Sequence, residues 1–128
     1  MITLTQEMKD LIATQLSFVA TVNPDRTPNL GPKGTMIVFD DQHLAFSELA
    51  VQQTWINLLN GSRIAVAVVD RATMRGFRFS GTPELVYSGE RYDRAVALIR
   101  MPSPKAVVII AVDKIDKLGF PYPDQPDS

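Results

Sequence analysis

The chain has 128 residues, of which 45% are hydrophobic and 21% are charged, so it is expected to fold as one globular domain. Thirteen basic and fourteen acidic side chains leave a net charge of −1, which excludes the basic excess that binds nucleic acids or anionic membrane surfaces. The lack of cysteine excludes disulfides and thiolate catalysis, and no apolar run or N-terminal signal pattern indicates a membrane or an export route. We therefore expect one cytoplasmic domain over residues 1–128, with no nucleic-acid or membrane partner.

The first half of the chain predicts a helix and three strands. Residues 5–15 have helical periodicity, with Thr3 or Thr5 as the expected cap, and residues 16–22 form a strand that ends in a turn at residues 23–27. Residues 28–39 are predicted as one long strand, although the stretch Gly31-Pro32-Lys33-Gly34 interrupts it with residues that disfavour strands. A turn at 40–43 leads to a short strand at 44–47.

The second half predicts two helices and three strands. A helix over residues 51–61 ends at Asn60-Gly61, and residues 63–70 form an apolar strand that we expect to be buried on both faces or nearly so. Residues 75–87 form a long strand, in which Gly81 and Pro83 predict a bend or bulge. A helix capped by Ser88 covers 88–100, a last strand covers 105–118, and a proline-rich tail covers 118–128.

These six strands and about three short helices predict a mainly β protein. Most connections are short enough for hairpins, so the sheet is expected to be antiparallel. Six strands of this hydrophobicity bury their apolar faces best by curling into a small barrel whose ends the helices close.

Metal and hydrolytic chemistry find no support in the residue pattern. His43 is the only histidine, and it lies in a turn beside Asp40 and Asp41, where a solvated turn is the simpler interpretation. No serine lies in a recognisable nucleophile elbow near a histidine, so no nucleophile–base pair is predicted.

Two segments could bind a ligand. Around Lys33, the two flanking glycines would let a flat ligand approach the backbone, and the lysine would supply a cation at the edge of the ligand. The alternative is a strand bulge with a surface lysine. Residues 47–54 run from a strand into a helix start, which could hold a phosphate or could simply cap the helix. Because the two segments are neighbours in a hairpin, we expect them to open on one mouth of the barrel.

Residues 16–86 resemble the pyridoxamine 5′-phosphate oxidase-like flavoproteins, which are FMN-binding split β-barrels. The resemblance rests on the hairpin "TVNPDRTPNLGPK", on the apolar run before Asp70, and on the spacing of Arg75, Arg78 and Gly81. It implies a six-stranded antiparallel split β-barrel and a homodimer with FMN in the cleft between the subunits. It also implies an oxidoreductase or electron carrier that reacts with a small-molecule redox donor or acceptor, with no catalytic acid or base from the chain.

The resemblance also implies where the cofactor would lie. Residues 32–35 would pass along the flavin ring and ribityl chain, the segment from Ser47 to the helix start would hold the phosphate end, and two aromatic tail residues could cover the ring from the other subunit. The predicted cofactor-binding residues are Pro32, Lys33, Gly34, Thr35, Ser47, Glu48, Gln52, Gln53, Thr54, Arg75, Phe120 and Tyr122.

This resemblance suggests why a lysine interrupts the second strand. A cation near the flavin ring would favour the reduced, anionic form and raise the reduction potential. Family members commonly carry Lys or Arg, which pairs with the phosphate, where this chain has Gln53. A deazaflavin or a haem therefore remains an alternative ligand. A non-enzymatic dimeric module remains an alternative role.

Overall fold

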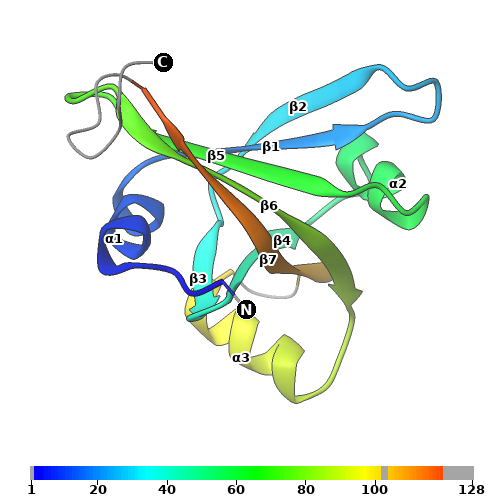
Figure 1. Cartoon of the computed structure of the whole chain (residues 1–128). Helices are drawn as coiled ribbons and strands as arrows, with labels where there is room; N and C mark the ends of the chain where they lie inside the picture. Colours follow the sequence, from blue (N-terminus) through cyan, green and yellow to red (C-terminus); the bar gives the residue numbers. More distant parts are fainter. Residues whose placement is uncertain (1, 102–103, 120–128) are drawn as a thin grey trace.

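Seven antiparallel strands and three helices make up the fold, which the computed structural model describes for residues 2–101 and 104–119 (Figure 1). The strands lie in one sheet, and the helices lie around it. In chain order the elements are α1 (Gln6–Thr14), β1 (Ser17–Val22), β2 (Pro28–Lys33), β3 (Ile37–Asp40), β4 (His43–Glu48), α2 (Gln53–Leu59), β5 (Ile64–Asp70), β6 (Arg75–Val86), α3 (Glu90–Ile99) and β7 (Ala106–Leu118).

The sheet has seven strands in the order β2-β1-β5-β6-β7-β4-β3, one more strand than the sequence predicts. The extra strand arises because the predicted strand at residues 28–39 is two strands. β2 pairs with β1, whereas β3 pairs with β4. The sheet is therefore not closed by hydrogen bonds, and its two edge strands, β2 and β3, are consecutive in the chain.

The link over residues 34–36 joins the two edges of the sheet. Residues 34 and 35 form a turn, and the amide of Met36 donates to the carbonyl of Lys33 at 3.3 Å. This connection explains the strand-breaking residues, because the chain leaves one edge here and enters the other (Figure 1). The expected split β-barrel is confirmed, with the split between β2 and β3.

The helix ends agree with the sequence in two cases and differ in one. Thr5 caps α1 as expected, since its hydroxyl accepts from the amide of Met8, and Gly61 follows α2 with a φ of 82°. The predicted cap at Ser88 is wrong. Gly89 takes the N-cap position of α3 with a φ of 98°, so the chain turns one residue later than a serine cap would require.

The main core fills the inside of the curled sheet and includes Val19, Phe46, Val66 and Phe79. A second apolar cluster lies between α3 and strands β3, β4 and β7. We expect β5 to be buried on both faces or nearly so, and the structure shows buried and half-buried residues alternating along it, so one face lies in the core and the other is partly exposed. The predicted irregularity in the long strand is confirmed by a register shift between Ser80 and Gly81.

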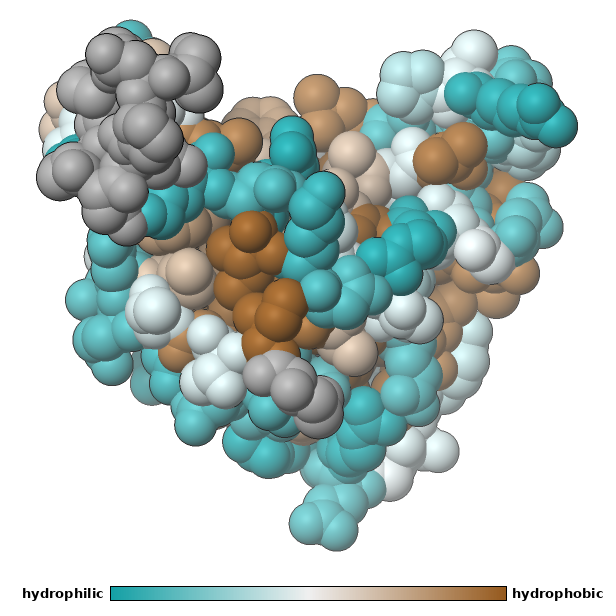
Figure 2. Space-filling view, in the orientation of Figure 1, coloured by the Kyte–Doolittle hydropathy of each residue, from teal (hydrophilic) through white to brown (hydrophobic). Residues whose placement is uncertain are grey.

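None of the helices in residues 2–101 and 104–119 is long and apolar enough to cross a membrane. Figure 2 shows that hydrophilic side chains cover much of the face on which β6 and β7 lie, around a hydrophobic area near its centre.

Candidate functional site

A hollow of about 230 Å³ lies where the link between β2 and β3 passes the end of β4, and we call it the Lys33 hollow. It brings together seven of the twelve residues that the sequence assigns to a cofactor. Its lining consists of Pro32, Lys33, Gly34, Thr35, Ser47, Glu48, Leu49, Ala50 and Gln52. Residues 32–35 and part of the predicted segment 47–54, namely Ser47, Glu48 and Gln52, face one opening. The two segments are not neighbours in a hairpin, because β2 pairs with β1 and β4 pairs with β3 and β7.

An ion pair spans this hollow. The Nζ of Lys33, at the end of β2, lies 2.6 Å from Oε1 of Glu48, at the end of β4, and only 14% and 2% of the two side chains are exposed. Lys33 is the cation in this hollow, and Glu48 balances its charge. The geometry is that of an ion pair without an aligned hydrogen bond, because Oε1 of Glu48 has no hydrogen-bond partner among the described residues.

The position of the pair follows from strand alternation. Leu44, Phe46 and Glu48 share one face of β4, and the first two belong to the main core. Lys33 lies over the Phe46 ring, with Nζ 5.6 Å from the ring centre. Lys33 and Glu48 therefore meet on the inner side of the curled sheet, across the split between its edges.

Thr35 fastens the link to β4. Its hydroxyl accepts from the amide of Ser47 at 3.1 Å and donates to the carbonyl of the same residue at 3.5 Å. The hydroxyl of Ser47 is buried and has no hydrogen-bond partner in the described part of the chain. A buried polar atom without a partner is a common feature of ligand and water sites.

The backbone around Lys33 is open. A Cβ added at Gly31 or Gly34 would meet no atom within 4 Å, and neither residue has a positive φ. The glycines are therefore not required by packing within this chain. They leave free space beside the backbone, as the sequence predicts for the approach of a flat ligand.

Two predicted residues, Gln53 and Thr54, belong to a polar network between α2 and the β1–β2 hairpin and do not line the hollow. The Nε2 of Gln53 donates to Oδ1 of Asn57 at 2.8 Å, and the hydroxyl of Thr54 accepts from Asn29 at 3.2 Å. Asn57 is fully buried and donates to Thr21 and to Asn23, both at 2.9 Å. The network fastens α2 to the β1–β2 hairpin.

Sequence reasoning missed this network. Asn57 stands in the middle of an apolar helical pattern, where an asparagine is unfavourable, and that local conflict is the signal that could have found it. Gln52 lines the hollow, and the cofactor role of Gln53 and Thr54 stays a prediction.

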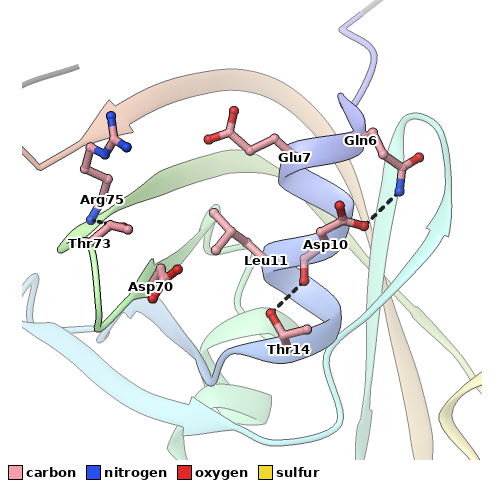
Figure 3. Close-up of a pocket in the computed structure, with 8 residues that line it drawn as sticks. All are labelled: Gln6, Glu7, Asp10, Leu11, Thr14, Asp70, Thr73 and Arg75. Atoms are coloured by element: carbon pink, nitrogen blue, oxygen red, sulfur yellow. Dashed lines mark hydrogen bonds between the residues drawn. The ribbon is translucent and has the colours of Figure 1, made fainter. Parts of the chain in front are cut away.

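Arg75 lines a different hollow, which we call the Arg75 hollow. It measures about 490 Å³ and lies between α1 and the turn that joins β5 to β6. Figure 3 shows that Glu7 and Leu11 of α1 face this hollow from one side, and Asp70 and Arg75 lie on the other. Within one chain Arg75 is therefore not brought to the Lys33 hollow, and its cofactor role stays a prediction.

The remaining candidates lie elsewhere. Phe120 and Tyr122 lie outside the described residues. His43 pairs through Nδ1 with Asp40 at 2.7 Å in the β3–β4 turn. Partial burial raises the pKa of Asp40, but hydrogen bonds from the Gln42 amide and from His43 outweigh it and hold that pKa below its usual value. No group of three or more metal-ligating side chains occurs in residues 2–101 and 104–119.

A protein-family model and several solved structures match this chain. A model of the pyridoxamine 5′-phosphate oxidase family matches residues 4–119. The HupZ protein of Group A Streptococcus is 47% identical, and a crystal structure of a variant of it matches with a TM-score of 0.83 over 92% of this chain and 100% of that chain. No curated protein matches significantly.

Two further solved structures share the fold. A protein of Lactobacillus delbrueckii, named as a candidate pyridoxamine 5′-phosphate oxidase, is 28% identical, with a TM-score of 0.81 over 91% of this chain and 95% of that chain. An FMN-binding protein of Syntrophomonas wolfei is 16% identical, with a TM-score of 0.76 over 91% of this chain and 87% of that chain. At 16% identity the likeness concerns the fold alone.

Proposed function

Because this chain belongs to the pyridoxamine 5′-phosphate oxidase family, we propose that it binds FMN at the Lys33 hollow and serves as an oxidoreductase or electron carrier. The observation that carries this proposal is the Lys33 hollow itself, where an open glycine backbone adjoins a buried ion pair. The cytoplasmic location stays a prediction.

The residues of the hollow fit a flat, polar ligand such as a flavin. Open space lies beside Gly31 and Gly34, so the ring of a ligand can approach the main chain. The buried hydroxyl of Ser47 has no partner among the residues that the structure describes, and Lys33 adds a donor with three hydrogens. Backbone groups of residues 32–35, Ser47 and Gln52 would hold and orient the flavin.

The chemistry would come from the cofactor. A bound flavin supplies hydride or electron transfer at its N5 atom, so the protein needs no acid or base of its own. The protein would position the ring, set the charge beside it and keep water from one side of it. Lys33, Glu48 and the surrounding backbone would do this.

One subunit offers too little space for the whole cofactor. The hollow of about 230 Å³ is smaller than the roughly 300 to 1,000 Å³ of usual cofactor pockets. A second surface must complete it, and we propose that this surface belongs to a second copy of the chain, as the family resemblance implies.

An apolar face beside the hollow supports this homodimer. The outward side chains of β2, β1 and β5 lie opposite one another in register and carry no charge, and Phe18, Val22 and Leu30 are 41%, 52% and 67% exposed. Uncharged faces of this kind mark protein interfaces. The face consists of Phe18, Ala20, Val22, Pro28, Leu30, Pro32, Ala65 and Ala67, and Pro32 also lines the Lys33 hollow.

The visible absorption spectrum tests the proposal directly. Purified protein is mixed with excess FMN and desalted, and we expect two flavin absorption bands to remain at about one cofactor per chain. Protein that stays colourless after the same treatment would contradict FMN binding. Deazaflavin and haem, the two alternative ligands, are then tested in the same way. Reduction by candidate donors, followed by reoxidation, distinguishes an enzyme with a preferred donor from a carrier.

The substitution Lys33→Met tests the role of the cation. Removing it leaves the Glu48 carboxylate uncompensated beside the ring, so the reduced, anionic flavin should bind at least about tenfold more weakly relative to the oxidised form. The midpoint potential of bound FMN, measured by dye equilibration, should therefore fall. Lys114→Met, at an exposed lysine, is the matched control. An unchanged potential together with unchanged FMN affinity would show that Lys33 does not face the cofactor.

A further inference from the structure

Glu48 is a buried carboxylate paired with Lys33. The family resemblance assigns it to the phosphate end of the cofactor, and a buried negative charge is not expected there. Its side chain is 2% exposed, and its partner in the described structure is Lys33, at 2.6 Å. A carboxylate can accept about four hydrogen bonds, and Oε1 of Glu48 accepts none from the described residues. A buried charge of this kind is retained only when a nearby group compensates it.

The charge of the hollow follows from this pair. Lys33 contributes one positive charge and Glu48 one negative charge, and the other lining residues are uncharged. The hollow is therefore formally neutral. A phosphate placed here would bring up to two negative charges next to a buried carboxylate, and the repulsion would be strong in a region with little water.

From this balance we propose that Glu48 sets the charge of the Lys33 hollow, so that the hollow accepts the uncharged ring of a flavin and rejects its phosphate. This proposal rests on the proposed flavin binding. It places the flavin in a different orientation from the one that the family resemblance implies, in which the phosphate lies near Glu48. The ring edge lies at Lys33 and Glu48, and the phosphate is directed away from both residues. Glu48 is thus a positioning residue that acts on the ligand largely through Lys33.

The pair also suits the ring chemically. An ammonium group donates hydrogen bonds, and a carboxylate accepts them. The imide edge of a flavin alternates carbonyl acceptors with an N–H donor, so a fixed donor and acceptor side by side match two neighbouring positions of that edge. The phosphate offers acceptors alone and gives Glu48 no hydrogen bond.

A series of variants that changes the charge of the hollow tests the proposal. Glu48→Gln makes it +1, Lys33→Met makes it −1, and the double variant Lys33→Met/Glu48→Gln returns it to neutral. Glu84→Gln is the matched control, because Glu84 forms an exposed ion pair with Arg91 at 2.9 Å. For each protein, circular dichroism first checks folding. The affinities for oxidised FMN, reduced FMN and riboflavin are then measured.

We expect the preference for reduced over oxidised FMN to follow the charge of the hollow. It should rise about tenfold or more in Glu48→Gln, fall by a similar factor in Lys33→Met, and stay within about threefold of the wild type in the double variant and in Glu84→Gln. The ratio of the FMN and riboflavin affinities should stay constant within about threefold throughout. If Glu48→Gln does not fold, Lys33→Met and the double variant are compared with each other, because the charge of the hollow differs by one between them.

Three results would overturn the inference. A preference for reduced FMN that does not change across the folded variants would show that the pair is a structural lock without influence on the ring. A selective gain of FMN over riboflavin in Glu48→Gln would place the phosphate at Lys33. Failure of the wild type to bind either flavin would overturn the proposed function as well. The first two results would overturn only the role of Glu48, because in both of them flavin still binds.

Discussion

Asn57 shows how a single polar side chain can hold two parts of this fold together. It is fully buried, and three side-chain hydrogen bonds connect it to Thr21, Asn23 and Gln53. Its backbone carbonyl also accepts from the amide of Ser62. A fully satisfied buried network of this kind restricts its neighbours to one arrangement. It therefore fixes α2, which follows the Lys33 hollow in the chain, against the β1–β2 hairpin that carries Lys33.

Replacing Asn57 with leucine should destabilise the protein by about 2 to 4 kcal/mol, because Thr21 and Asn23 would lose the hydrogen bonds that Asn57 donates to them. Urea unfolding followed by circular dichroism measures the loss. Asn60→Ala, at an exposed position three residues later, is the control. Equal losses for the two variants would mean that the network contributes little.

At the scale of single elements, the β5–β6 pair shows where glycine is required by close packing. A Cβ on Gly76 would lie 1.9 Å from the carbonyl oxygen of Val68 on the neighbouring strand. Backbone atoms cannot move aside cheaply in the middle of a sheet. The opposite holds at Gly31 of β2, where a Cβ would meet open space.

The variant Gly76→Ala should therefore lower the free energy of unfolding by about 1 to 3 kcal/mol and the melting temperature by roughly 5 to 15 °C. Gly31→Ala should leave the melting temperature of the cofactor-free protein within about 2 °C of the wild type. Differential scanning calorimetry compares the two. If Gly31→Ala unfolds as early as Gly76→Ala, the backbone beside Lys33 is packed more closely than the structure shows.

The element scale is also where the sequence prediction failed. The helices and most strands were predicted from local periodicity, and the link at residues 34–36 was missed because β2 and β3 are both extended. Nothing in the local pattern distinguishes one long strand from two strands that pair with different neighbours. The strand-breaking residues at 31–34 indicated an interruption, but not the change of sheet edge.

At the scale of the whole molecule, the apolar face of β2, β1 and β5 is the surface through which we propose that two chains pair. Leu30 is 67% exposed on that face, so a charge there should not disturb the fold of one chain. In the proposed homodimer the same charge would be buried against the partner, at a large desolvation cost.

We therefore expect Leu30→Asp to convert a dimer into a folded monomer and to reduce FMN retention strongly, since the second surface of the site is lost. Light scattering after gel filtration gives the molecular mass, and absorbance gives the cofactor content. Leu98→Asp, at a 46% exposed residue of α3, should leave both unchanged. A wild-type chain that is already monomeric and still holds FMN would refute the dimeric site.

The sequence by itself determined the kind and approximate length of most elements, the absence of cysteine chemistry, and the family resemblance. These properties follow from composition and from the spacing of neighbouring residues, which is local information. Only the tertiary structure decided that β2 and β3 lie on opposite edges, that Glu48 neutralises Lys33, and that Asn57 joins α2 to a hairpin. Each of these pairs residues that are far apart in the chain, and the choice depends on which strands pair, which no local pattern encodes.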